Sequence, residues 1–111
     1  MFTPVLYPTP WEGVVFFKYT CDASPSTSQL NLGFVPRFAM GWNATDKDQM
    51  WVWSDGMTAA HCMTITTAAT AVTSAGVTAV QQTDGTNHGL QIGTDAALQE
   101  ASKVFQGFAV R

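Results

Sequence analysis

Short apolar runs, separated by turn-forming residues roughly every ten positions, constrain the fold of this chain more than any other feature. None of them has the length and the 3.6-residue period of a convincing long helix. The runs cover residues 14–19, 30–42, 50–53, 63–66, 77–81, 90–93 and 103–110. This pattern predicts an all-β fold, an antiparallel β-sandwich or small barrel of about seven to eight strands.

The run from Leu30 to Trp42 has the clearest alternation, with its large apolar side chains on even positions. A period of two is typical of a half-buried strand. Pro36 lies inside the run and has no backbone N–H to donate. We therefore expect the strand to lie at a sheet edge or to break near this residue.

The run Met50–Trp53 is apolar at every position, so both of its faces need a cover. Trp51 and Trp53 share one face, and Met50 and Val52 share the other. At most one of these faces can belong to the internal core. We expect the other face to meet a second sheet, the N-terminal segment or another chain.

Residues 1–13 are expected to form an extended N-terminal arm, and residues 14–111 a single β domain. Three prolines in the arm exclude a helix and an internal strand. The arm also carries Phe2, Tyr7 and Trp11, whose exposure to water is unfavourable. It should therefore lie on a surface, either its own or that of a neighbour.

Two further segments carry local predictions. Thr94 and Asp95 are candidate caps for a short helical turn over residues 96–101. Residues 84–87, with the sequence DGTN, predict a loop between strands.

Charged residues are scarce: they make up 12% of the 111 residues, against about a quarter in soluble proteins. Because so few charges cannot cover a solvated surface, we expect part of the outside to be shielded by other molecules. The hydrophobic share of 46% is too high for a disordered chain. The net charge of -3 leaves no basic excess for phosphates, so the sequence predicts no nucleic-acid partner.

The N-terminus lacks the basic and apolar regions of a secretory signal, so we expect synthesis in a cytoplasm and use without export. Residues 56–83 contain no Asp, Glu, Lys or Arg, over about the length of a membrane span. Their many threonines favour strands instead. The sequence therefore predicts no membrane partner.

Few residues suit catalysis or metal binding. His61 and Cys62 are adjacent, and neighbours in a strand point to opposite faces, which disfavours a catalytic pair. Cys21 and Cys62 are expected to be buried thiols, although a disulfide between them stays open. The segment Asp46–Asp48 is too short for a calcium loop, and no zinc or phosphate-loop spacing occurs. We expect a non-enzymatic protein without catalytic residues, metal or cofactor.

Tryptophan is the strongest binding signal in the chain. The side chains of Trp11, Trp42, Trp51 and Trp53 can anchor a protein interface, stack on sugars or fill the core. These alternatives stay open at this point. The candidate partner-binding residues are Phe2, Tyr7, Trp11, Trp51 and Trp53.

Several short motifs resemble those of small structural proteins of tailed bacteriophage particles. They are GFVPRF at 33–38, WNATD at 42–46, MWVW at 50–53 and GM at 56–57, with GLQIGTD at 89–95 and FAVR at 108–111 near the end. The motifs cover about half of the chain, and none of them is a catalytic signature.

This resemblance implies a capsid decoration or cement protein on the outer surface of a virion, often a β-sandwich that forms homotrimers over contacts between major capsid subunits. Low charge and aromatic side chains suit that role, because a cement protein acts by burying surface against several neighbours. We expect the major capsid protein as partner, with self-association as a homotrimer. The alternative is a small carbohydrate-binding β-module on a fibre or adhesin, which would use tryptophans with Asp and Asn.

Overall fold

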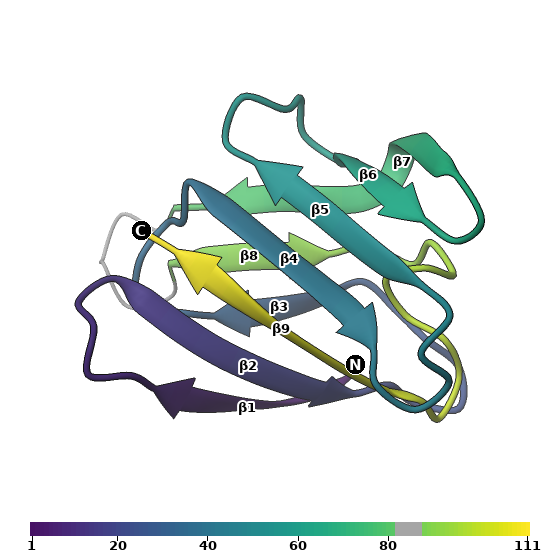
Figure 1. Cartoon of the computed structure of the whole chain (residues 1–111), viewed down its shortest axis with the longest axis horizontal. Coiled ribbons are helices and arrows are strands. Elements are labelled where there is room, and N and C mark those ends of the chain that lie inside the picture. The colour runs from purple at the N-terminus through teal and green to yellow at the C-terminus, as the bar shows by residue number, and fades with distance from the viewer. Residues whose placement is uncertain (82–87) are drawn as a thin grey trace.

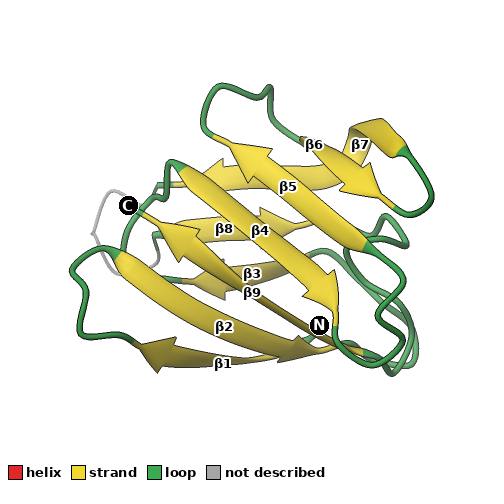
Figure 2. Cartoon of the chain, in the orientation of Figure 1, coloured by secondary structure: helices red, strands yellow, loops and turns green. Residues whose placement is uncertain are grey.

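Nine antiparallel strands form one continuous sheet in the computed structural model, which describes residues 1–81 and 88–111 (Figures 1 and 2). The strands are β1 (Thr3–Pro8), β2 (Val14–Thr20), β3 (Ser28–Asn31), β4 (Phe38–Asn43), β5 (Met50–Ser54), β6 (His61–Ile65), β7 (Ala69–Val80), β8 (Gly89–Ile92) and β9 (Val104–Val110). The predicted all-β antiparallel fold is confirmed, with nine strands where we expected seven or eight. The loop predicted at 84–87 lies outside the described residues.

The long strand β7 folds the sheet back on itself. Its first part, from Ala69 to Val72, pairs with β6, whereas Val77 to Val80 pairs with β8. A register shift opposite His61 and Cys62 separates the two parts. The strand order is β1-β2-β9-β4-β5-β6-β7-β8-β3, so β8 and β3 come to lie behind β4 and β9 (Figure 1). The result is a nearly closed, barrel-like sheet around one core.

The two edge strands of the sheet are joined near their ends. The backbone N–H of Phe2, just before β1, donates to Ser28 Oγ of β3 at 3.0 Å, and the Met1 amine contacts the Asp22 carboxylate. The segment 1–13 is therefore not a separate arm, because its middle forms an edge strand of the sheet and Phe2 is a core residue. The prolines permit this position because an edge strand needs donors on one side only.

The apolar run 30–42 forms two strands that lie far apart in the sheet. β3 pairs with β8, whereas β4 lies between β9 and β5, and the break falls around the buried Pro36, as predicted. The even-numbered side chains differ between the two strands. Leu30 is fully buried in the core, but Met40 and Trp42 alternate with buried residues and point outward.

A pair of glycines decides which side chains enter the core. Gly107 of β9 lies opposite both Phe17 and Gly41, and Gly41 lies opposite Trp51. The rings of Phe17 and Trp51 stack over this gap with their centroids 6.2 Å apart. A Cβ atom on Gly41 would lie 2.5 Å from Trp51 Nε1, so the two rings fit only because neither glycine has a side chain.

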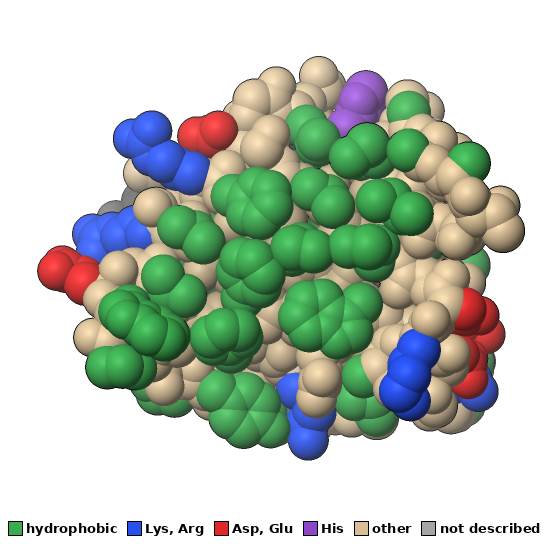
Figure 3. Space-filling view, in the orientation of Figure 1, with side chains coloured by type: hydrophobic (Ala, Val, Ile, Leu, Met, Phe, Trp, Pro, Cys, Tyr) green, Lys and Arg blue, Asp and Glu red, His purple; other side chains and the backbone are tan. Residues whose placement is uncertain are grey.

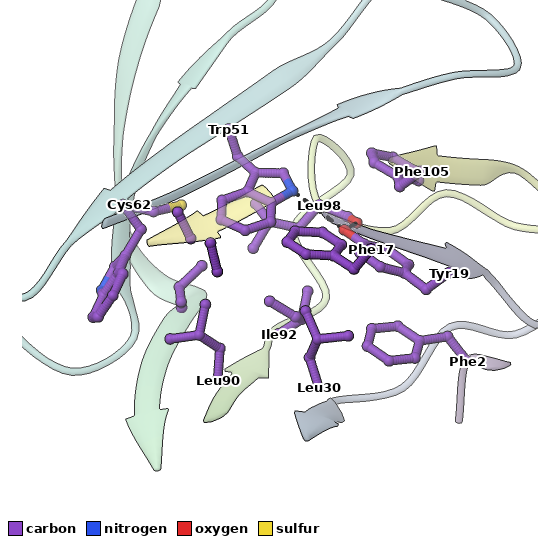
Figure 4. Packing of buried hydrophobic residues seen from close by; sticks show 14 of the residues in the cluster. Phe2, Phe17, Tyr19, Leu30, Trp51, Cys62, Leu90, Ile92, Leu98 and Phe105 are labelled. Carbon is purple, nitrogen blue, oxygen red and sulfur yellow. Dashed lines mark hydrogen bonds between the residues drawn. The ribbon is translucent and has the colours of Figure 1, made fainter. Parts of the chain in front are cut away.

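Tyr19 connects the aromatic core to a loop (Figure 4). Its ring stacks on Phe2 at 4.3 Å and on Phe105 at 5.5 Å between centroids. Its hydroxyl accepts a hydrogen bond from Trp51 Nε1 at 3.2 Å and donates one to the Leu98 carbonyl at 2.7 Å. Because both polar partners are buried, the hydroxyl enters the core without an unpaired donor.

The predicted cap at Asp95 is observed, although the helical turn is shorter than expected. Asp95 Oδ1 accepts the Ala97 N–H, and the Asp95 carbonyl accepts the N–H groups of Leu98 and Gln99. A single hydrogen-bonded turn results. In the described ranges, no helix is long and apolar enough to cross a bilayer.

Replacing Gly107 with alanine tests the role of the glycine pair. The new Cβ would meet the Met40 carbonyl oxygen and lie 2.7 Å from Phe17 Cζ, so the Phe17 ring or strand β4 must move. We expect Gly107→Ala to lower the free energy of unfolding by about 2–3 kcal/mol, measured by urea denaturation. The control Gly56→Ala meets no atom within 4 Å and should change stability by less than about 0.5 kcal/mol. Equal midpoints for the two variants would contradict this account.

Candidate protein interaction surface

An apolar surface covers the side of the sheet that faces away from the core, here called the outer face. It is defined by fifteen of the outward residues of β1, β2, β9, β4, β5 and β6, without Thr3, Thr20, Val104, Ser54 and His61. They are Val5, Tyr7, Val14, Phe16, Lys18, Gln106, Phe108, Val110, Phe38, Met40, Trp42, Met50, Val52, Met63 and Ile65. Figure 3 shows hydrophobic side chains gathered where Figure 1 draws β2, β9, β4 and β5.

The centre of the outer face is an uninterrupted row of apolar side chains, one from each strand. Each member lies directly opposite the next in the antiparallel register. The row is Tyr7, Phe16, Phe108, Met40, Val52 and Met63. Cross-strand neighbours on one face lie about 5 Å apart, so these side chains form one continuous ridge.

The strands β4 and β9 carry their larger apolar side chains outside rather than inside. Their inward positions hold Ala39, Gly41, Asn43, Phe105, Gly107 and Ala109, and their outward positions hold Phe38, Met40, Trp42, Val104, Gln106, Phe108 and Val110. Small inward residues leave room for the rings of Trp51 and Phe17. The consequence is that a large part of the apolar content of these strands faces away from the core.

Three phenylalanines form a cluster within the outer face. The ring centroid of Phe108 lies 5.9 Å from that of Phe16 and 6.1 Å from that of Phe38, and the planes are tilted by 54° and 42°. Tilted pairs at these distances are a favourable aromatic geometry. The contacts limit the motion of the three rings in the isolated chain, so a partner would meet a preformed apolar centre.

Trp11 lies in the turn between β1 and β2, next to the outer-face strands in the sequence, and is 65% exposed. The turn is organised by Thr9, whose Oγ1 lies 2.7 Å from the Val14 carbonyl and accepts the Trp11 N–H at 3.2 Å. The exposed ring is thus held on an ordered turn rather than on a loose tail. Aromatic residues in such positions are common anchors of protein interfaces.

The structure divides the five predicted partner-binding residues into two groups. Tyr7 and Trp11 are exposed, as a contact role requires, but Trp51, Trp53 and Phe2 are at most 3% exposed. These three side chains fill the core instead of facing a partner in this structure: Phe2 stacks on Tyr19, and Trp51 and Trp53 lie opposite small residues of β4.

One face of Met50–Trp53 belongs to the core, as expected; that the other face meets a partner stays a prediction. Trp51 and Trp53 face the core, and Met50 and Val52 lie on the outer face. Sequence reasoning missed Phe16, Phe38 and Phe108 as surface residues. The apolar face of Met50 and Val52 was a signal for them. Neighbouring strands share one outer face, so an apolar outward face on one strand indicates outward apolar residues on the next.

The two thiols are buried and free. Burial raises the pKa of Cys21, and burial together with the nearby Asp95 carboxylate raises that of Cys62 to about 12. Both side chains therefore stay protonated near neutral pH and are poor nucleophiles. In β6, buried Cys62 alternates with half-buried His61, which separates the two groups as the sequence predicted.

One acidic cluster was not foreseen in the sequence. Carboxylate oxygens of Asp46, Asp48 and Glu100 lie within 4.8 Å of one another. Lys103 Nζ lies 3.3 Å from Asp46 Oδ1, and the Asn43 amide donates to Glu100 at 3.1 Å. These partners offset part of the repulsion between the carboxylates. Surface carboxylates often cluster in this way, so we assign no metal ion to them.

Comparison with other proteins adds no family assignment. No protein-family model, curated protein or solved structure matches this chain.

The buried thiols predict a loss of stability at alkaline pH. The folded-state pKa of Cys62 is about 12, above the usual thiol value of about 8.5, so between these values the folded chain keeps a proton that the unfolded chain releases. The contribution of the protonated Cys62 thiol to the free energy of unfolding is therefore fully present below about pH 8 and is lost as the pH rises. We expect the urea midpoint to fall from pH 8 to pH 10, and to fall less in Cys62→Ala. An identical pH dependence in both proteins would contradict the prediction.

Proposed function

We propose that this chain is a non-enzymatic structural protein of a phage virion, a capsid decoration or cement protein that binds through its outer face. The observation that carries the proposal is the uninterrupted apolar row from Tyr7 to Met63, which no other part of the described chain covers. The sequence motifs described above supply the link to virions. Major capsid subunits are the partner proposed for this surface.

The size of the outer face supports a role in binding. With strands about 4.8 Å apart and outward residues about 6.8 Å apart along each strand, the residues that define the outer face cover roughly 500 Å². Apolar patches on monomers seldom exceed about 300–600 Å², and patches at that limit are often functional. A standard interface covers about 800 Å² on each partner, so the outer face with Trp11 and its polar rim is of the right order.

The edge of the sheet formed by β1 is poorly suited to binding another strand. Proline has no N–H, so Pro4 and Pro8 can pair with β2 only when their backbone nitrogens point to the free side of β1. On that side the Leu6 N–H is then the only donor of the strand. A partner strand would find too few donors, which favours docking through the outer face.

Trimeric binding fits the energetics of such a surface. At about 25 cal/mol per Å², covering roughly 500 Å² yields about 12 kcal/mol before the costs of association. Those costs are about 4–15 kcal/mol, so one copy should bind only modestly. Three linked copies that engage matching sites around a symmetry axis would bind much more tightly. We therefore retain the homotrimer as part of the proposal.

Replacing Phe16 tests the role of the outer face. The side chain is 41% exposed, so Phe16→Ser should leave the fold intact. We expect it to reduce binding to phage particles that lack the chain by about tenfold or more, measured by co-sedimentation and quantitative mass spectrometry. The control Leu6→Ser changes a side chain of similar exposure that points to the other side of β1.

Two results would count against the proposal. One is the absence of the wild-type chain from purified virions of the phage that encodes it. The other is equal binding of the wild-type chain and Phe16→Ser.

A carbohydrate-binding module remains the second candidate, and one pocket favours it. The pocket has a volume of about 340 Å³ and is lined by Trp42 together with Lys47, Asp48 and Gln49. Gln49 Oε1 is buried without a hydrogen-bond partner within the described residues. An indole beside donors and acceptors is a common arrangement for sugar binding.

Glycan-array binding by the purified chain tests this candidate. We expect binding, if present, to be lost in Trp42→Ala and retained in Trp11→Ala, because Trp11 lies at the opposite end of the strands. Glycan binding with no binding to particles would reverse the ranking of the two functions.

A further inference from the structure

Lys18 is the only Asp, Glu, Lys or Arg residue in any of the nine strands. Among residues 1–81 and 88–111, every other charged side chain lies in a turn, in a loop or at a chain end. In β2, Lys18 alternates with the buried residues Phe17 and Tyr19, which places it on the outer face. The outer face therefore contains one cationic side chain and no carboxylate.

The neighbours of Lys18 in the sheet are uncharged. Val5 of β1 and Gln106 of β9 lie directly opposite it, and Phe16 is the next outward residue of β2. Asp22 lies four positions after Lys18, beyond the end of β2, and Glu12 lies six positions before it, in the β1–β2 turn.

No carboxylate of the described chain forms an ion pair with Lys18. The two ion pairs among the described residues join Asp22 to the Met1 amine and Asp46 to Lys103. The Lys18 side chain is half-buried in the isolated chain, in which the outer face is open. When another molecule covers the face, no carboxylate of the described chain is in place to pair with the Lys18 ammonium.

Covering the outer face would remove water from this ammonium. Burial of an unpaired charge is strongly unfavourable, and an ion pair with good geometry offsets much of that cost. We propose, on the basis of the function proposed above, that the capsid surface covering the outer face presents a carboxylate opposite Lys18, surrounded by apolar side chains. Lys18 would then determine specificity, because an apolar surface without this acid would bind poorly.

A second copy of this chain, packed face to face, cannot supply the acid. No strand contains Asp or Glu, so two outer faces in contact would bury two lysines without counter-charges. The acidic groups that the structure describes lie outside the strands, in polar segments that do not match a large apolar face. The geometry therefore points to a different protein as the partner of the outer face.

Substitutions of Lys18 test this inference by the direction of their effect. Binding is measured by co-sedimentation with phage particles that lack the chain. If the capsid surface presents a carboxylate, Lys18→Met leaves that acid unpaired and should weaken binding by about 30-fold or more. Lys18→Glu should weaken it further, and Lys18→Arg should retain most of it. The controls are Gln106→Met, the neutral neighbour on the same face, and Lys47→Met, which removes a loop charge. Each should change binding by less than about threefold.

Three outcomes would overturn the inference. Tighter binding by Lys18→Met would mean that the covering surface has no acid, while the loss of binding in Phe16→Ser would still support the proposed function. Absence of wild-type binding would overturn both proposals. Dissociation of a wild-type oligomer by Lys18→Glu, seen in sedimentation of the isolated chain, would place the counter-charge on a second copy.

Discussion

The contact between two glycines in neighbouring strands determines most of this structure. Gly41 and Gly107 meet across β4 and β9, and the rings of Trp51 and Phe17 occupy the space above them. A sheet with larger inward residues at these positions could not accommodate both rings. The stack around Tyr19 continues this packing, since the Tyr19 ring lies 6.1 Å from that of Phe17 and 5.5 Å from that of Phe105.

The same packing explains the unusual surface. Apart from Phe105 and Asn43, the inward residues of the two central strands are small, and most of their large apolar side chains, Phe108 and Met40 among them, lie outside. The large aromatic side chains of β2 and β5 fill much of the core, together with aliphatic side chains of β3, β7 and β8. The chain thus has one buried apolar layer that stabilises the fold and a second apolar layer that is left for a partner. This second layer, rather than a cluster of reactive groups, is the basis of the function that we propose.

The sequence predicted the fold class well and the site only in part. Alternation and turn residues identified the strands, and the two apolar faces of Met50–Trp53 indicated that one of them lies outside the core. The choice between these faces depends on which strands become neighbours. Gly41 and Gly107 are far apart in the sequence, so their contact cannot be read from either segment alone. For this reason Trp51 was assigned to a partner surface although it is buried.

Hydroxyl-radical footprinting of the outer face, in the isolated chain and in the assembled particle, tests the central claim most directly. The account predicts strong labelling of Phe16 and Phe108 in the isolated chain and protection of both in the particle. Trp51 should be protected in both states because it is buried in the core. Equal labelling of the two phenylalanines in both states would contradict the claim that this surface is the one covered in the assembly.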